Sequence, residues 1–507
     1  MTLTRVYRRR IHSLALTVAF GAAALPLGAQ APTLASQSQS SAGAIDDRRL
    51  ADHPRVAQAL ELVRVWLDAQ RAYDEIPGIS AGVVHDQQMV WSGGFGFADP
   101  ARRVAADART IYSICSISKL FTSIGVLQLR DAGKLRLDDP VSRHLSWFKI
   151  RRPADAPEIT IEGLLTHASG LPRESDHAYW TGPEFAFPTR EQIIERIANQ
   201  ETLYPAETYF QYSNLGLTLA GEVVAATSGQ SYTDYVQRNI LDPLGLRSTT
   251  PEMPERERGG RLAVGYSAIS RDGSRVPVPF FTARGIAPAA GYASTVEDLG
   301  RFASWHFRLL ARGGSEVLRA HTLREMQRVH WVDPDFETTW GLGYSVWRND
   351  NKTFVGHGGS CPGYRTQLLL KPDEKVATVF MANAQGVNTT QFAQRMYDIV
   401  APAIKVAVKD TVKLRPADPT LTPYVGTYAS GFAGEIAVVR WEDGIATLGL
   451  PTMDPVRGLT KLRKVGEHTF RRVRRDDTLG ETIVFDMGAD GRPTRMLWHS
   501  NHYRRVR

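Results

Sequence analysis

The sequence predicts a large α/β (α+β) domain followed by a second, small all-β domain. Three observations lead to this prediction. Strand-like patterns occur at both ends of residues 50–405 around a helix-rich middle, so distant segments should close one sheet. A Pro- and Lys-bearing linker, 406–422, comes next. Residues 423–507 then consist of short alternating runs separated by turns, which is typical of a small barrel or sandwich.

Residues 1–35 have the pattern of a secretory signal peptide. They hold four arginines and no acidic residue, followed by the apolar run Leu14–Leu27, which is too short to span a bilayer, and by small residues. We expect this segment to be removed and the mature protein to be exported, either periplasmic or secreted; an uncleaved anchor is the alternative. The polar residues 36–49 are expected to be a flexible leader.

Helical and strand periodicities follow in order along the large domain. A first helix is expected over Val56–Tyr73, and a β-hairpin over Gly78–Phe97 with its turn at Asp86–Gln88. The next helix begins near Ser116 and ends at Gly133. Further helices are predicted at Ile161–His167, Arg190–Asn199, Leu215–Thr227, Thr295–Leu310 and Thr390–Ile404, and strands at Gly343–Trp347, Thr353–Gly356, Gln367–Leu370 and Val376–Ala382.

The net charge of +8, from 61 Lys+Arg against 53 Asp+Glu, is unevenly spread. Four positive charges belong to the expected signal, and residues 411–507 hold 16 basic against 11 acidic residues. The part between them is almost neutral, which leaves a nucleic-acid partner without a basis. The basic run Arg471–Arg475 favours a solvated face; contact with an anionic cell envelope is the sharper alternative.

A serine and a lysine stand three residues apart where a helix is expected to begin. Positions i and i+3 share one face of a helix, so Lys119 can reach the Ser116 oxygen. The helix N-terminus favours developing negative charge, and a desolvated lysine can act as a neutral base. Alone, the S-x-x-K pattern is weakly specific.

Two further motifs follow in a fixed order. Tyr212-Ser213-Asn214 begins 96 residues beyond Ser116, and His357-Gly358-Gly359 begins 145 residues beyond Tyr212. The ordered set resembles the serine β-lactamase, penicillin-binding protein and D-peptidase superfamily, which carries S-x-x-K, then Y-x-N, then K-T-G or H-x-G. Segments that match its class C-like and esterase-like branch are Leu164–Leu171, Ala290–Thr295 and Gly356–Gly359.

This resemblance covers about residues 50–405 and implies an antiparallel sheet with a helical subdomain. It implies that Ser116 is the nucleophile of an acyl-enzyme and that Lys119 and Tyr212 share the general-base work. Asn214 is expected to hydrogen-bond both the substrate amide and Lys119. No cofactor is implied, and the sequence lacks the His and Cys spacing of a zinc site.

The third motif departs from the β-lactamases proper, which usually have Lys where this chain has His357. A neutral imidazole offers a substrate carboxylate a hydrogen bond rather than a permanent charge. The departure favours D-aminopeptidase, carboxypeptidase or esterase activity over strong β-lactam hydrolysis. The resemblance assigns substrate contact to Gly358 and Gly359, and an oxyanion hole to the backbone N–H groups of Ser116 and Ser360.

Both cysteines lie beside the motifs. Cys115 precedes the nucleophile, and Cys361 follows the last motif glycine by two residues. Export and an even count favour pairing. The family brings the two segments together, so the resemblance implies a Cys115–Cys361 disulfide; two free buried thiols are the alternative.

Two other segments invite a functional interpretation. The run Glu174–Phe187 is an aromatic-rich loop, expected to be packing and, as the alternative, to line the cleft. The segment Tyr424–Tyr428, followed by the Asp443-Gly444 turn and Phe485-Asp486, is similar to the lipocalin-like C-terminal domains of some hydrolases of this family. By that likeness, the domain would pack near the cleft and restrict substrate size.

Two classes of function remain open on the sequence. The first is an exported serine hydrolase that acts on small-molecule or peptide substrates: esters, D-amino-acid amides or, poorly, β-lactams. The second is a penicillin-binding sensor or peptidoglycan-binding protein that acylates without turnover. The complete set of Ser116, Lys119, Tyr212 and Asn214 favours the enzyme.

Overall fold

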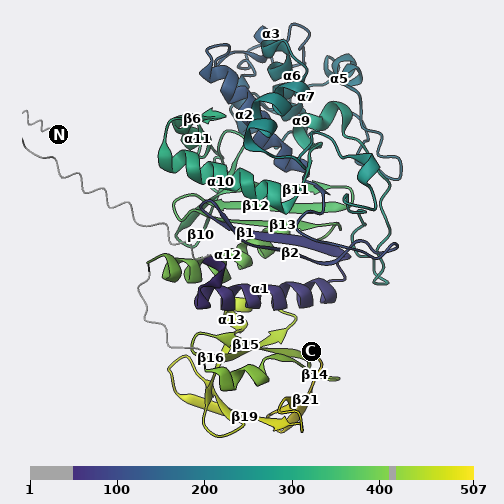
Figure 1. Ribbon diagram of the computed structural model, residues 1–507. Helices are drawn as coiled ribbons and strands as arrows, with labels where there is room; N and C mark the ends of the chain where they lie inside the picture. Colours follow the sequence, from purple (N-terminus) through teal and green to yellow (C-terminus); the bar gives the residue numbers. More distant parts are fainter. Residues whose placement is uncertain (1–49, 410–417) are drawn as a thin grey trace, which may run out of the picture. The chain divides into compact units, whose positions relative to one another are not determined.

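The large domain is built on a nine-stranded antiparallel sheet. The computed structural model describes residues 50–409 and 418–507 (Figure 1). The strand order is β3-β2-β1-β13-β12-β11-β10-β9-β8, and every neighbouring pair is antiparallel. The strands are β1 (Gly78–His85), β2 (Gln88–Asp99), β3 (Val104–Ala105), β8 (Trp331–Val332), β9 (Thr339–Trp340), β10 (Ser345–Asn349), β11 (Lys352–Cys361), β12 (Tyr364–Lys371) and β13 (Val376–Ala382).

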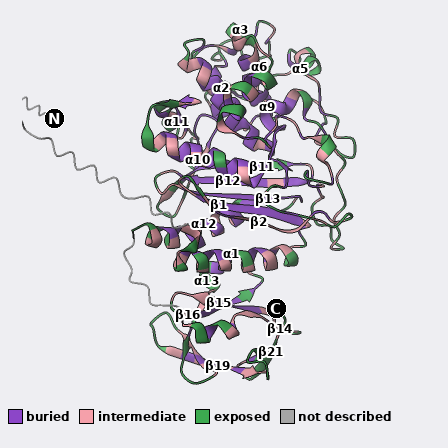
Figure 2. Ribbon diagram, viewed as in Figure 1, coloured by how far each residue is buried: buried purple, intermediate pink, exposed green. Residues whose placement is uncertain are grey.

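The first and last parts of the large domain meet in the middle of this sheet, as predicted. Strand β1 pairs with β13, with Gly82 opposite Val379. Strand β13 is buried at every position, because helices cover both faces of the sheet (Figure 2). Its sequence is apolar except for Thr378, whose hydroxyl donates to the Ala393 carbonyl, as such a two-sided burial requires.

Helices form the layers on either side of the sheet (Figure 1). Helices α1 (Pro54–Tyr73) and α12 (Thr389–Lys409) pack on one face, and α10 (Val296–Arg312) packs on the other. The helical subdomain continues from α10. Its helices are α2 (Ser118–Asp131), α3 (Val141–His144), α4 (Ile161–Thr166), α5 (Arg190–Ile197), α6 (Asn214–Ser228), α7 (Tyr232–Val236), α8 (Asp242–Leu244), α9 (Ala287–Ala290) and α11 (Ala320–Met326).

Several elements differ in their bounds from the sequence prediction, and three of these differences concern the motifs and the linker. The 3-10 turn η2 (Cys115–Ile117) precedes α2, so Ser116 lies in that turn rather than in the α-helix. Strand β11 runs on to Cys361, five residues beyond its predicted end, and so carries the whole third motif. Helix α12 continues to Lys409, four residues into the expected linker, because its apolar face still packs on the sheet.

The small domain is a closed eight-stranded barrel with its own core, which decides between the barrel and the sandwich. The short helix η6 (Pro419–Tyr424) leads into it, and Tyr428 and Phe485 pack in the interior. The predicted Asp443 and Asp490 turns each join two strands. The strands are β14 (Gly426–Ser430), β15 (Gly434–Trp441), β16 (Gly444–Leu450), β17 (Thr460–Lys464), β18 (Thr469–Val473), β19 (Leu479–Met487), β20 (Pro493–Trp498) and β21 (Asn501–Arg505).

The barrel contacts helices α1 and α12. The indole N–H of Trp66 donates to the Thr452 carbonyl at 2.8 Å, and the Thr452 N–H donates to Gln70 Oε1 at 3.0 Å. The guanidinium of Arg395 pairs with Asp454 at 3.3 Å. Apolar residues from both domains continue one core cluster across this junction.

The expected signal peptide and leader, residues 1–49, lie outside the described residues, as do residues 410–417 of the predicted linker. Within the described ranges, every helix is too short or too polar to cross a membrane.

Candidate active site

A tight turn presents Ser116 at the start of α2. Cys115 adopts φ 51°, a left-handed conformation that is energetically costly for any residue other than glycine. Such a conformation persists only where the surrounding structure enforces it. The Ser118 hydroxyl donates to the Cys115 carbonyl and accepts from the Tyr292 N–H at 3.0 Å. The Ile114 N–H donates to the Tyr292 carbonyl at 2.8 Å. Neighbouring residues thus hold the turn on both sides of the serine.

Cys115 and Cys361 form the predicted disulfide, with their Cα atoms 5.6 Å apart. It joins the turn that carries Ser116, the predicted nucleophile (the nucleophile turn), to the end of β11 across 246 residues of sequence. Thr366 of β12 adds a second tie, because its hydroxyl donates to the Ile114 carbonyl at 3.3 Å. The nucleophile turn and the strand that carries the third motif are therefore fixed to each other.

Lys119 is fully buried and reaches three oxygen atoms. Its Nζ lies 3.1 Å from Ser116 Oγ, 2.8 Å from Asn214 Oδ1 and 2.8 Å from the Ala289 carbonyl. Burial lowers the pKa of Lys119 well below its ordinary value, because removal from water penalises the ammonium. The i to i+3 spacing brings Lys119 to Ser116 as the sequence predicted.

Tyr212 and Asn214 enter the site at the start of α6. Ser213 caps this helix: its hydroxyl accepts from the Gly216 N–H at 2.8 Å and donates to the Pro172 carbonyl at 2.6 Å. The Tyr212 ring lies 4.9 Å from Lys119 Nζ.

The Tyr212 ring is enclosed by other rings. His167 stacks on it at 4.3 Å between centroids, and Trp340 meets it edge-on at 5.9 Å. His167 Nδ1 accepts from the Ser213 N–H at 3.1 Å, a structural role as expected. Trp340 comes from β9, and no sequence motif pointed to it.

Burial raises the pKa of Tyr212; the Ser116 hydroxyl and the Arg173 guanidinium oppose that shift. The phenol is thus held protonated while the pKa of Lys119 is lowered. The opposite directions of these two shifts do not favour the tyrosinate that general-base work by Tyr212 would need. A neutral amine can accept a proton, and a protonated phenol can donate one.

His357 lies on β11, buried and neutral. Its Nδ1–H donates to the Gly358 carbonyl at 2.6 Å, which leaves Nε2 as an acceptor without a partner among the described residues. Burial, and then the charge of Lys119, lower the pKa of His357 to about 3. The imidazole therefore carries no charge at neutral pH, as the sequence argument expected. Its remaining nitrogen accepts rather than donates, so it cannot give a substrate carboxylate the expected hydrogen bond.

The two motif glycines serve different purposes. A Cβ at Gly359 would lie 2.3 Å from the Ile114 carbonyl oxygen and 2.2 Å from Thr366 Oγ1, so glycine is needed for β11 to reach the nucleophile turn. A Cβ at Gly358 would meet only the Gln367 side chain, at 2.9 Å. Packing within the chain, rather than room for a substrate, thus accounts for Gly359.

A cleft of about 850 Å³ opens over Ser116. Ser116, Tyr212, Asn214 and the whole stretch His357–Ser360 line it, and the exposed Ser360 lies at its edge. Trp180 and Phe185 of the aromatic loop also line it, whereas Tyr179 and Phe187 are buried in the core. The loop therefore combines both predicted roles.

The barrel contributes no residue to this cleft within the described parts of the chain. The expectation that the small domain restricts substrate size is therefore wrong. The barrel packs on α1 and α12 instead, because their exposed apolar surface is on that side of the sheet.

Across residues 50–409 and 418–507, no three His, Cys, Asp or Glu side chains gather closely enough to hold a metal ion.

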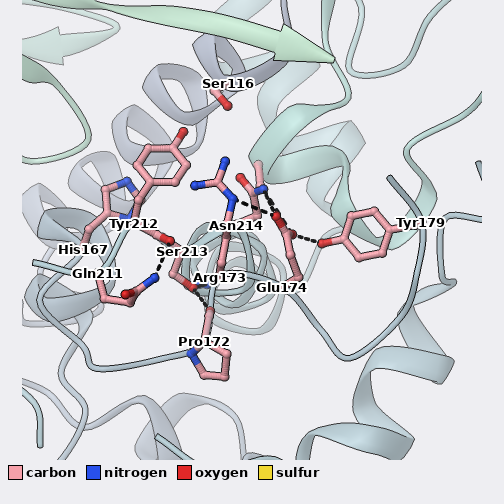
Figure 3. A network of polar contacts seen from close by, with 12 residues as sticks. Ser116, His167, Pro172, Arg173, Glu174, Tyr179, Gln211, Tyr212, Ser213 and Asn214 are labelled. Atoms are coloured by element: carbon pink, nitrogen blue, oxygen red, sulfur yellow. Dashed lines mark hydrogen bonds and ion pairs between the residues drawn. The ribbon is translucent and has the colours of Figure 1, made fainter. Parts of the chain in front are cut away.

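A charged pair beside the motifs was not found from the sequence. Figure 3 shows Arg173 and Glu174 between Tyr212 and Tyr179. Arg173 Cζ lies 4.9 Å from the Tyr212 ring centroid, and its Nε is 3.2 Å from Glu174 Oε1. Both Glu174 oxygens accept from Asn214 Nδ2, at 2.8 and 3.2 Å. The only sequence signal was their position after the matched segment Leu164–Leu171.

Comparisons with known proteins agree with this geometry. The sequence model of the beta-lactamase family matches residues 66–402, about two thirds of the chain. Penicillin-binding protein 4 of Amycolatopsis lactamdurans is 28% identical over 370 residues, which cover 71% of this chain and 95% of that protein.

Two solved structures share the fold. The octameric penicillin-binding protein homologue from Pyrococcus abyssi has a TM-score of 0.59 at 23% identity and covers 88% of this chain and 100% of its own. A D-stereospecific amidohydrolase from Streptomyces sp. has a TM-score of 0.54 at 25% identity, with 69% and 99% covered.

Proposed function

The chain belongs to the beta-lactamase family, and on that premise we propose that it is a serine hydrolase that works through an acyl-enzyme on Ser116. Its substrates in this proposal are esters and D-amino-acid amides or peptides, with β-lactams as poor substrates. The position of Lys119 carries the proposal: a buried amine with a lowered pKa lies 3.1 Å from the hydroxyl that must lose its proton.

The proposed acylation moves one proton and one acyl group. Ser116 Oγ attacks the substrate carbonyl carbon while its proton passes to Lys119. The resulting oxyanion is held by the backbone N–H groups of Ser116 and Ser360. The tetrahedral intermediate collapses, the bond to the leaving nitrogen or oxygen breaks, and that atom takes the proton through Tyr212. Water then attacks the Ser116 ester by the same route and releases the acid.

The substrate class rests on the third motif and on one relative. His357 is neutral and presents an acceptor nitrogen, so it lacks the cation that would meet a β-lactam carboxylate. One structure of the same fold is a D-stereospecific amidohydrolase. Trp180 and Phe185 add an apolar wall, which suits an apolar acyl group or side chain.

Export and envelope contact are part of the same proposal. A secretory signal over residues 1–35 and a disulfide between the only two cysteines suit an oxidising compartment. The basic strand that carries Arg471 and Arg472 would face an anionic envelope. Release of the barrel from anionic vesicles by salt would support this contact, and equal binding to neutral vesicles would contradict it.

The enzyme and the sensor differ in turnover. We expect purified protein to hydrolyse p-nitrophenyl esters or D-amino-acid anilides over many cycles and a chromogenic cephalosporin slowly, if at all. The Ser116→Ala variant should lose this turnover while keeping its melting temperature. Labelling of Ser116 by the same panel in a one-to-one ratio without further turnover would favour the penicillin-binding sensor instead.

A further inference from the structure

Asn214 lies between an anion and a base. Its Oδ1 accepts from Lys119 Nζ at 2.8 Å, and its Nδ2 donates to Glu174 at 2.8 and 3.2 Å. The side chains of Asn214 and Lys119 are buried, so neither bond is replaced readily by water. In Figure 3, the Glu174 carboxylate faces the Asn214 amide on the side away from Tyr212.

The carboxylate settles which way the amide faces. An ionised carboxylate only accepts hydrogen bonds, so Glu174 can bond the amide nitrogen of Asn214 and never its oxygen. If the amide were turned over, two oxygens would face each other at Glu174, and the amide N–H would occupy the lone pair of a neutral Lys119. We infer that Glu174 is a positioning residue, which orients the Asn214 amide and through it aims the Lys119 nitrogen at Ser116.

The direction of the Lys119 lone pair follows from the number of hydrogen bonds that a neutral amine can make. Neutral lysine has two N–H donors and one lone pair. Two carbonyl oxygens, Asn214 Oδ1 and the Ala289 carbonyl, each lie 2.8 Å from Nζ and take the two N–H groups. The lone pair is then left for the third neighbour, the Ser116 hydroxyl at 3.1 Å. Loss of the Asn214 acceptor would leave one N–H without its partner, and the lone pair would no longer be held toward Ser116.

The fold holds Glu174 in place from several sides. The Arg173 carbonyl accepts from the Asn214 N–H at 2.8 Å at the start of α6, which sets the loop beside the amide. The buried Tyr179 hydroxyl donates to Glu174 Oε2, and Gln200 Nε2 donates to the Glu174 carbonyl at 3.0 Å. Burial raises the pKa of Tyr179, so this donor stays protonated.

Charged and titratable groups face Lys119 from each element packed around it. Arg173, Glu174 and Tyr212 lie on the chain before α6. His167 directly follows α4, and His357 lies on β11. Both histidines have pKa values lowered by burial and are neutral. Burial is the main cause of the lowered pKa of Lys119; of its two charged neighbours, Glu174 raises this pKa and Arg173 lowers it further.

The test distinguishes the effect of the Glu174 charge from the effect of the Asn214 amide orientation. The inference itself rests on the proposed function. Glu174→Gln keeps an acceptor for Asn214 but removes the charge, whereas Glu174→Ala removes both. We expect Glu174→Ala to lower the rate of Ser116 labelling by a fluorophosphonate about 10- to 100-fold. Glu174→Gln should recover most of that rate, because the amide stays oriented.

The pH profile gives a readout that a merely structural residue would not move. Acylation requires neutral Lys119, so its rate rises with pH through the lysine pKa. Glu174→Gln removes the anion that raises this pKa, so the rise should move to lower pH; Arg173→Gln should move it to higher pH. Glu222→Gln on α6, whose carboxylate pairs with Arg190 at 2.7 Å, is the matched control and should move neither.

Lysine side-chain NMR titration of Lys119 decides the inference even if turnover is absent. Opposite displacements of its pKa in Glu174→Gln and Arg173→Gln, with melting temperatures close to that of the parent, would support it. Equal losses in Glu174→Ala and Glu174→Gln, or an unmoved lysine titration, would overturn it. A parent protein that neither turns over nor labels would overturn the proposed function alone.

Discussion

The two walls of the cleft are built from opposite kinds of chemistry. On the helical wall, Ser116, Arg173, Tyr212 and Asn214 line the cleft, and the ionisable Lys119 and Glu174 lie behind them, each bonded to Asn214. The strand wall, His357–Ser360 of β11, is neutral: its one titratable ring has a pKa of about 3. The groups that can move a proton therefore lie on the helical wall, whereas the strand wall contributes its backbone and its shape to the cleft.

The difference shows how one cleft divides its tasks. Each ionisable group of the helical wall has a partner: Glu174 pairs with Arg173, and Lys119 is hydrogen-bonded to Asn214. On the strand wall, glycine lets the backbone approach the nucleophile turn within contact distance. We expect substitutions on the helical wall to affect chemistry and those on the strand wall to affect packing.

The largest effect is expected from Lys119→Met. The variant fills the same buried space without an amine, so Ser116 loses its base and kcat/KM for an ester should fall by about 10³-fold. The measurement is steady-state hydrolysis together with a melting curve, which should stay near that of the parent. A fall of less than tenfold would mean that the helical wall does not hold the base.

The disulfide ties one wall to the other, and its removal should come next. Replacing both Cys115 and Cys361 by Ala should lower the free energy of unfolding by about 2–4 kcal/mol, because the bridge spans 246 residues. Urea unfolding with and without reductant measures this loss. Reductant should destabilise the parent and leave the double variant unchanged; an unaffected parent would contradict the prediction.

A matched pair of glycine substitutions compares two positions on the strand wall. Gly359→Ala places a methyl group 2.3 Å from the Ile114 carbonyl oxygen and should cost about 1–3 kcal/mol of stability. Gly358→Ala meets only the end of a flexible glutamine and should cost less. Chemical denaturation of both variants gives the comparison. The reverse order would show that β11 does not depend on this close approach.

The smallest effect on catalysis is expected from His357→Gln. Because the pKa of His357 is about 3, its ring does not titrate between pH 5 and 8, and the substitution should leave the pH profile of kcat/KM unchanged there. A profile whose limb near neutral pH vanishes in the variant would show that the strand wall takes part in proton transfer.

The same residue should affect acid stability. The folded-state pKa of His357 lies below the ordinary value, so its contribution to stability is complete above about pH 6.5 and is lost as the pH falls toward 3. The parent should therefore lose more stability than His357→Gln on acidification. Thermal melts at pH 7 and pH 4 measure the difference, and an equal loss in both proteins would contradict it.

Local sequence patterns were sufficient to predict those elements whose position depends mainly on one kind of contact. Strand β13 appears with its predicted bounds because its apolar run is buried on both faces. The S-x-x-K spacing brings Lys119 to Ser116 because both lie within one turn of chain. Strand β11 was predicted too short, since His-Gly-Gly-Ser has little strand preference; its length depends on pairing with β12 and on the tie to the nucleophile turn.

By itself, the sequence determined the α/β domain, the small β domain, the order of the three motifs and, through the family resemblance, the cysteine pair. Only the tertiary structure decided that Glu174 faces Asn214, that burial lowers the pKa of Lys119 and raises that of Tyr212, and that the barrel lies on α1 and α12 rather than at the cleft. Each of these depends on burial and on contacts between segments 40 to several hundred residues apart, which no local pattern of residues encodes.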